Sequence, residues 1–253
     1  MKIVTWNLRC PWKHTDEQNA FIHRAGFIYD KIIGEKPEII AFQEVIPESL
    51  ELLKRMLPEY EFYGCFRTAN YAQEGLFVAV LKGKFVVLTS DAFWLSPTPY
   101  VAGSRFENQS DCPRVCAYVK LADKVTGEIL NIFDLHLDHI SDEAKQLGLE
   151  LVFKYIDEKG EAVDKNSTVL LGDYNAHRGD GVMQYAFAQD WLVDSTKEVG
   201  GTFHNFGKDC RQIDYILISK ALESRVEKVD TWRDEHSGIY LSDHYPVCLE
   251  LKW

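Results

Sequence analysis

Short apolar stretches that end in polar or charged residues recur along the whole chain, and this ordered pattern constrains the fold more than any other feature. They are residues 2–7 (KIVTWN), 39–44 (IIAFQE), 133–139 (FDLHLDH), 169–175 (VLLGDYN), 213–215 (IDY) and 242–244 (SDH). Loops at strand ends carry most ligands and catalytic groups in sheet proteins, so these side chains can converge on one edge. Asn, Glu, His and Asp converging there would form a site for a hard metal cation with acid/base groups beside it. The pattern therefore indicates metal-assisted hydrolysis of a phosphate ester.

The composition limits which class of protein this can be and which kind of partner it can bind. A length of 253 residues permits a sizeable core, and 46% apolar with 13% aromatic residues excludes a disordered chain. No linker of biased composition and no internal repeat divides the sequence, so we expect one domain over residues 1–253. The net charge is −11, and no cluster of Lys and Arg provides the basic patch typical of proteins that bind long nucleic acids. The charge favours a small anionic substrate over a nucleic acid.

The sequence carries no signal for secretion or membrane insertion. Met1 and Lys2 lead directly into an apolar strand-like run, and no apolar stretch reaches transmembrane length. The cysteines lack the paired spacing of a disulfide framework or a zinc site. They are Cys10, Cys65, Cys112, Cys116, Cys210 and Cys248. We expect a cytoplasmic protein with free thiols and no membrane partner.

Periodicity and turn residues predict an α/β fold. We expect helices that begin at Thr15 or Asp16, at Pro47 and at Ser141, because each residue can cap or open a helix ahead of helically spaced apolar residues. Continuous apolar runs are typical of strands buried on both faces. Two strand–helix–strand passages, with antiparallel-looking strands between and after them, predict two packed mixed sheets flanked by helices. Residues 96–113 are predicted to form a long loop.

The polar motifs together resemble the endonuclease/exonuclease/phosphatase superfamily, which includes DNase I, apurinic endonucleases, deadenylases, sphingomyelinases and inositol phosphatases. The matching motifs are residues 6–7 (WN), 43–44 (QE), 74–75 (EG), 136–139 (HLDH), 172–176 (GDYNA), 213–215 (IDY) and 242–244 (SDH). They follow the family's order from residue 3 to about 247. The resemblance implies a DNase I-like four-layer α/β sandwich and a magnesium-dependent phosphoesterase, in which Mn²⁺ could replace Mg²⁺. Residues 93–99 (FWLSPTP) resemble a compact bacterial branch of the superfamily.

The resemblance also implies a metal site and a general base. Glu44 is the expected principal metal ligand, with Asn7 and Asp243 nearby. Asp173 is expected to take the proton from the attacking water, and Asn175, two residues further on, to orient the phosphate or the water. Without the other motifs, Glu44 could be a helix-capping charge and Asp173 an ordinary turn residue.

Two histidines and an arginine complete the implied site. In the family's pattern each histidine is held by its own carboxylate, and the matching pairs are His136 with Glu74 and His244 with Asp214. A carboxylate partner raises the pKa of a histidine and so favours a cationic donor to a phosphate oxygen or leaving group. Arg114 matches the arginine that contacts the phosphate in nuclease members. Glu74 is the weaker match, since residues 71–75 are also predicted to form a turn.

Arg9 separates this chain from part of the family. Many nuclease members have an acidic residue at its position, which argues against an apurinic endonuclease. Arg9 could contact the phosphate, or it could form a surface salt bridge. A second departure is Gln212, which stands where a basic residue often precedes the Ile-Asp-Tyr motif.

These features favour a phosphatase or phosphodiesterase acting on a small phosphorylated metabolite such as a sugar phosphate. The alternative within enzymes is a nuclease or a deadenylase-like 3′-exonuclease, since aromatic residues in predicted loops could stack bases. These are Trp12, Phe66, Tyr71, Phe106 and Phe206. A catalytically silent binding scaffold is a more remote alternative, because it would have no need for a cluster of mutually repelling carboxylates. The number of metals and the oligomeric state stay open.

Overall fold

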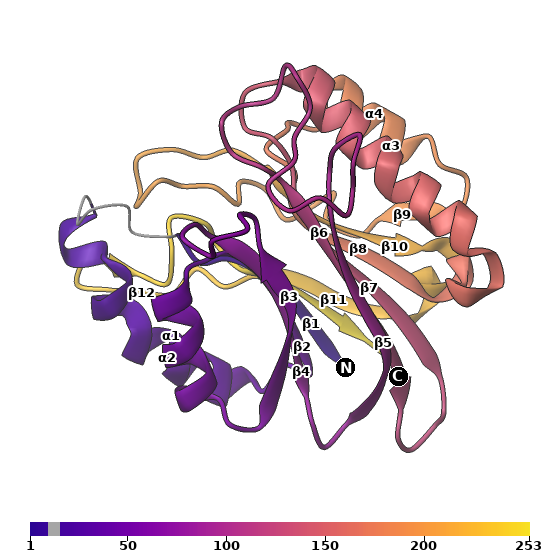
Figure 1. Cartoon of the computed structure of the whole chain (residues 1–253). Helices are drawn as coiled ribbons and strands as arrows, with labels where there is room; N and C mark the ends of the chain where they lie inside the picture. Colours follow the sequence, from indigo (N-terminus) through magenta and orange to yellow (C-terminus); the bar gives the residue numbers. More distant parts are fainter. Residues whose placement is uncertain (10–15) are drawn as a thin grey trace.

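Two six-stranded mixed β-sheets form the centre of the computed structural model, which describes residues 1–9 and 16–253 (Figure 1). The strands of the first sheet, in spatial order, are β11 (Val226–Thr231), β14 (Val247–Leu251), β1 (Lys2–Asn7), β2 (Ile39–Val45), β4 (Gly75–Leu81) and β3 (Tyr60–Phe66). Only the central pair of this sheet, β1 and β2, is parallel. The two strands therefore end at the same edge, where Asn7 and Glu44 lie.

The second sheet has the same plan. Its strands, in spatial order, are β5 (Phe85–Trp94), β6 (Val115–Asp123), β7 (Ile129–His136), β8 (Thr168–Asp173), β10 (Asp214–Ser219) and β9 (Leu192–Asp194). Here β7 and β8 are the parallel pair, and their register places His136 beside Asp173. The antiparallel strand β10 begins where β8 ends, so Asp214 lies opposite Asp173. A short hairpin of β12 (Glu235–His236) and β13 (Ile239–Tyr240) stands apart from both sheets.

Helices cover the outer faces of the two sheets. They are α1 (Phe21–Glu35), α2 (Pro47–Met56), α3 (Asp142–Lys159) and α4 (Gly181–Phe187), with 3-10 segments η1 (Glu17–Asn19), η2 (Gly160–Ala162), η3 (Lys165–Ser167) and η4 (Lys220–Arg225). Helices α1 and α2 lie on one side of the molecule and α3 and α4 on the other (Figure 1). The predicted four-layer α/β sandwich is confirmed.

Three apolar clusters hold the four layers together. In β1, Ile3 packs between the sheets, whereas Val4 and Trp6 pack against the layer that contains α1 and α2. A third cluster joins the second sheet to α3 and α4. A strand buried on both faces needs apolar residues at consecutive positions, which is why residues 39–42 of β2 (IIAF) form a continuous apolar run in place of an alternating one.

Local signals account for the starts of α2 and α3. Pro47 is the first residue of α2, and the Ser141 side chain caps α3 by accepting a hydrogen bond from the Ala144 backbone at 3.1 Å. The predicted start of the first helix is wrong, because α1 begins only at Phe21, after η1. The alternative cap, Thr15, lies outside the described residues.

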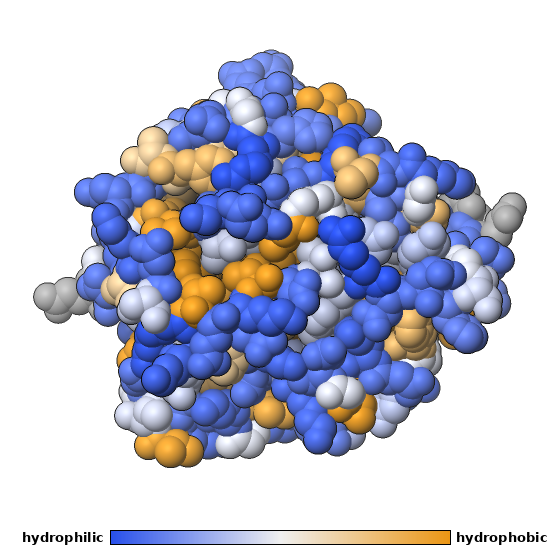
Figure 2. Space-filling view, turned by 180° about the vertical axis from the view of Figure 1, so that it is seen from behind, coloured by the Kyte–Doolittle hydropathy of each residue, from blue (hydrophilic) through white to orange (hydrophobic). Residues whose placement is uncertain are grey.

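The surface is mainly hydrophilic. From behind, the largest group of hydrophobic side chains lies toward the middle of a mostly polar face, and smaller hydrophobic groups lie elsewhere on it (Figure 2). None of the helices in residues 1–9 and 16–253 is both long enough and apolar enough to cross a bilayer. The structure shows free thiols at Cys65, Cys112, Cys116, Cys210 and Cys248, and Cys10 is outside the residues that it describes.

Gly172 in β8 allows the close approach of β7. A Cβ atom at this position would lie 1.9 Å from the Leu135 carbonyl oxygen, and the backbone φ of 143° disfavours any other residue. We expect Gly172→Ala to lower the free energy of unfolding by about 2–3 kcal/mol, because the strand pair must separate to admit the methyl group. Urea denaturation measures the change.

Gly26 provides the matched control. It lies in α1, and no atom comes within 4 Å of the position that an alanine methyl group would take. Gly26→Ala should raise the free energy of unfolding by about 0.5–1 kcal/mol, since alanine is the better helix former. A similar effect of the two substitutions would show that the contact with Leu135 does not constrain the sheet.

Candidate functional site

The residues that the sequence singles out converge where the central strands of both sheets end. Asn7 and Glu44 come from β1 and β2, and His136 and Asp173 from β7 and β8. The rest flank these strands or begin neighbouring ones: Glu74, Arg114, Asn175, Asp214, Asp243 and His244. The convergence follows from the topology, because parallel strands present their carboxyl ends at the same edge of a sheet.

Asp173 lies at the centre of this group and is almost fully buried. One carboxylate oxygen accepts a hydrogen bond from the Asn7 side chain at 3.0 Å, and the other accepts from the Asn175 backbone at 2.8 Å. The Nε2 atoms of His136 and His244 lie 3.5 and 3.8 Å from the first oxygen. Burial raises the pKa of Asp173 to about 7, and the charge of Asp214 adds to the shift. This carboxylate can accept a proton near neutral pH.

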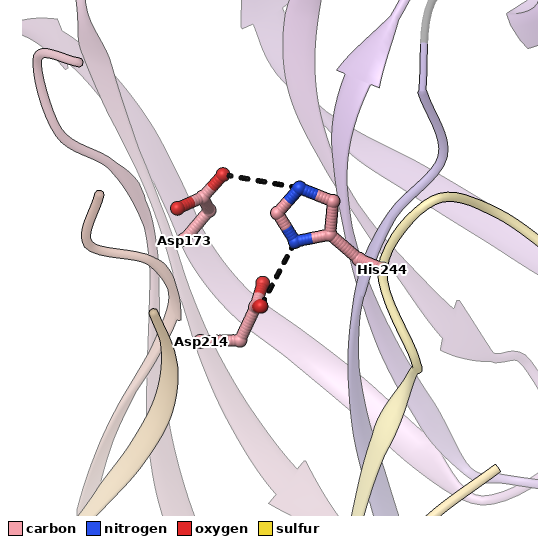
Figure 3. A group of neighbouring side chains, drawn as sticks. All are labelled: Asp173, Asp214 and His244. Carbon is pink, nitrogen blue, oxygen red and sulfur yellow. Dashed lines mark hydrogen bonds and ion pairs between the residues drawn. The ribbon is translucent and has the colours of Figure 1, made fainter. Parts of the chain in front are cut away.

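His244 and Asp214 form a buried hydrogen-bonded pair. The Nδ1 atom of His244 lies 2.9 Å from Asp214 Oδ2, and the opposite ring nitrogen faces Asp173 (Figure 3). Burial opposes the charged form of His244, but the hydrogen-bonded carboxylate of Asp214 and two further aspartates outweigh burial and raise the pKa to about 10. The structure thus pairs His244 with Asp214, and the raised pKa favours the cationic form of the ring.

His136 differs from His244 in its partner and its charge. Glu74, its predicted partner, forms an ion pair with Arg67 and lies 3.8 Å from an Arg114 nitrogen. Among residues 1–9 and 16–253, no hydrogen bond or ion pair joins Glu74 to His136. Burial, followed by the charges of Arg114 and Arg67, holds the pKa of His136 well below its usual range. The prediction of a cationic His136 held by Glu74 is wrong, because the two arginines take the carboxylate.

Asn7, Glu44 and Asp243, the residues that the resemblance implies as metal ligands, lie at the same edge of the first sheet. Glu44 lies at a bulge of β2 with a φ of 57°, and its carboxylate accepts a hydrogen bond from the Asn7 side chain at 3.1 Å. Burial raises the pKa of Asp243, and the charge of Glu44 adds to the shift. Carboxylates that repel one another in such a cluster fit a hard divalent cation that takes oxygen ligands, whereas the Asn7 amide turns its nitrogen toward Glu44 and Asp173.

A second group could also hold a metal. Potential ligand atoms of Asp173, Asp214 and His244 all lie within 4.8 Å of one another. However, the hydrogen bond between Asp214 and His244 already uses one atom of each. The oxygen set around Glu44 leaves this pair intact, so we regard it as the better candidate.

The three residues expected to contact the phosphate, Arg9, Arg114 and Asn175, differ in how many of their hydrogen-bond donors already have a partner. Arg9 forms a bidentate ion pair with Asp16, in which its Nε and Nη2 donate to the two carboxylate oxygens at 3.0 and 3.2 Å. The Nε atom of Arg9 also lies 3.7 Å from the Asp243 carboxylate. Arg114 donates toward His139 at 2.9 Å, whereas its buried Nε makes no hydrogen bond within the described part of the chain. Asn175, with a φ of 48°, donates to the Leu137 carbonyl at 3.2 Å. Arg114 thus has a guanidinium nitrogen next to the site that makes no hydrogen bond among the described residues, and this Nε lies 3.9 Å from the Asp138 carboxylate.

The sequence analysis did not identify two arginines near the site, Arg67 and Arg24. Arg67 follows β3, and no motif marks it. Arg24 lies on the apolar side of α1, between Phe21 and Ile28, and a charge on an apolar stripe is a recognisable signal. Its guanidinium donates to the carbonyls of Asn19, Leu8, Arg9 and Leu241, at 2.5–3.1 Å.

The sequence pattern of the endonuclease/exonuclease/phosphatase family matches residues 4–244, almost the whole chain. The chain belongs to this family. Its members are hydrolases that act on phosphoester bonds, so the chain is a phosphoesterase of this class. No curated protein matches the sequence.

Solved structures of bacterial family members are similar over the full length. An endonuclease/exonuclease/phosphatase from Bacteroides vulgatus is 27% identical, with a TM-score of 0.89 over 99% of this chain and 98% of its own. The mannosyl-6-phosphatase Bt3783 of Bacteroides thetaiotaomicron is also 27% identical, with a TM-score of 0.87 over 100% of both chains. Zebrafish (D. rerio) TDP2, solved with a single-stranded DNA product, is 16% identical with a TM-score of 0.74 over 98% of this chain and 97% of its own. This last similarity concerns the fold alone.

Removal of the Glu44 carboxylate tests the metal site. Because Glu44 is the expected principal ligand, Glu44→Gln should raise the half-saturating Mg²⁺ concentration for activity by at least about tenfold. The exposed Glu51 of α2 is the control, since Glu51→Gln should leave the Mg²⁺ dependence unchanged. Full wild-type activity in excess chelator would exclude a metal requirement.

A double-mutant cycle tests the pair of His244 and Asp214. His244→Ala and Asp214→Asn should each lower kcat, and the double variant should be little worse than the worse single one, because the two residues act as a unit. Adding Glu51→Gln to His244→Ala should instead give independent effects. Additive losses for His244 and Asp214 would show that they act separately.

Proposed function

We propose that this phosphoesterase is a magnesium-dependent hydrolase of a small phosphorylated metabolite, with a sugar phosphate as the substrate class. The observation that carries the proposal is the position of Asp173, a buried carboxylate between Asn7, His136 and His244. A bound divalent ion would neutralise charge on the phosphate and stabilise the charge that develops at phosphorus. Glu44, Asn7 and Asp243 would hold it.

The side chains of the site divide the reaction between them. Asp173 takes a proton from water as the water oxygen forms a bond to phosphorus and the ester P–O bond breaks. His244, held as a cation by Asp214, donates to a phosphate oxygen or to the departing alkoxide. Neutral His136 and Asn175 orient the phosphate or the water, and Arg114 offers its guanidinium group to a phosphate oxygen. Each role follows from a contact or a charge in the site.

Two observations support a small substrate. One is the net charge of −11, which disfavours a long polyanion. The other is the full-length similarity to a mannosyl-6-phosphatase at 27% identity. Of the aromatic residues invoked for base stacking, Phe66 packs against Tyr71, Phe206 pairs with Tyr240, and Trp12 lies outside the described residues.

A panel of substrates, combined with a variant that lacks the general base, tests the proposal. At saturating Mg²⁺ the wild-type protein should hydrolyse hexose phosphates faster than oligonucleotides, phospholipid headgroups or nucleotides. Asp173→Asn should lower kcat on the same substrate by roughly two to four orders of magnitude, because it removes the general base. Its melting temperature should be unchanged or higher, since repulsion within the carboxylate cluster falls.

Two results would contradict the proposal. Near-wild-type turnover by Asp173→Asn at saturating metal would make Asp173 a structural turn residue. Preferred cleavage of oligonucleotides, with a KM that rises steeply with added salt, would favour a nuclease, because binding to a polyanion releases counterions. A small phosphate ester should show only a mild salt dependence.

A further inference from the structure

A cavity of about 590 Å³ opens beside the carboxylate cluster. Arg9 lines it, and the Nε atom of Arg9 is 3.7 Å from Asp243, so the cavity begins at the rim of the candidate metal site. Phe206, Lys208 and Tyr240 also line it. The volume lies within the range of about 300–1,000 Å³ that small-molecule sites occupy. The cavity is therefore large enough for the alcohol part of a phosphate ester.

The loop that carries Phe206 has an unusual backbone. Asn205, Phe206 and Gly207 are consecutive left-handed residues, with φ of 45°, 54° and 84°. A left-handed non-glycine residue costs on the order of 1–3 kcal/mol unless its surroundings impose the conformation, and such residues cluster at functional sites. Here the backbone nitrogens of Lys208 and Asp209 donate to the His204 carbonyl at 2.8 and 2.9 Å and impose the turn. The strained turn places a half-buried aromatic ring on the cavity wall.

The same loop is attached to the catalytic segment. The backbone nitrogens of His204 and Asn205 donate to the Asp243 carbonyl at 2.9 and 3.1 Å. Phe203 forms a β-bridge with His244. These contacts fix the position of Phe206 relative to Asp243 and His244, which would bind the metal and protonate the substrate. A residue that selects the substrate must be held in a fixed position relative to the reacting groups.

The cavity combines an aromatic wall with polar groups. The rings of Phe206 and Tyr240 lie 6.3 Å apart at 50°, and the polar residues Gln18, Asn19 and Asn205 line the same space. An aromatic face packs against the C–H face of a sugar ring, while amides bond its hydroxyls. We propose that this cavity is a leaving-group subsite for a hexose ring, in which Phe206 and Tyr240 select cyclic over acyclic phosphate esters. The proposal rests on the proposed phosphoesterase function.

The test compares a cyclic and an acyclic substrate. At saturating Mg²⁺, Phe206→Ala should raise KM for mannose 6-phosphate by about tenfold or more, and change KM for glycerol 3-phosphate by less than about twofold. Phe206→Tyr keeps the ring and should restore the wild-type KM, which separates loss of the aromatic face from loss of the fold. Phe187→Ala is the matched control, because Phe187 is a half-buried phenylalanine at the end of α4.

Calorimetry separates this proposal from the proposed reaction. Asp173→Asn should bind mannose 6-phosphate, and adding Phe206→Ala should weaken that binding by the same factor as it raises KM. If binding of mannose 6-phosphate depends on Phe206 but the wild-type protein hydrolyses no phosphate ester, the result supports the proposed subsite and contradicts the proposed hydrolysis. Equal effects of Phe206→Ala on the two substrates, no effect on either, or no binding of the sugar phosphate would overturn the subsite.

Discussion

The amide of Asn7 joins the two sheets at the point where their carboxylates would otherwise repel one another. Its nitrogen donates to Glu44 from the first sheet and to Asp173 from the second, at 3.1 and 3.0 Å. Both carboxylates belong to strands whose other residues are deeply buried, so water cannot screen their charges well. The site depends on this shared donor, because a buried carboxylate without a partner is unfavourable.

Arg24 gives the loops around the site a common support. From inside α1 its guanidinium donates to carbonyls of the segment after β1, of the segment before α1 and of the segment that precedes Asp243. Burial lowers the pKa of this guanidinium to about 10, and the charge of Asp243 opposes that shift. The positive charge in the apolar layer thus partly balances the carboxylates that it helps to position.

Much of the fold could be predicted from local patterns. Pro47 and Ser141 mark helix starts because the conformation of proline and the hydrogen bond of a serine cap act within one turn. The start of α1 could not be predicted in this way, because residues 17–19 form a separate 3-10 turn. Strands β3 and β11 also lack a local signal, since both are partly exposed and have no strong apolar run.

Residue type and order were enough to determine the family, the sandwich of two mixed sheets and the set of polar side chains at the strand ends. The partners of those side chains were decided only when the chain folded. Glu74 binds Arg67 and Arg114 and leaves His136 neutral, whereas His244 keeps its aspartate and is cationic. The sequence motifs match each histidine to a carboxylate and mark Glu74 only as the weaker match, so they do not show which groups each ring meets in the fold. Their charges differ because a pKa depends on burial and on charges brought close by the fold, at distances that the order of residues does not encode.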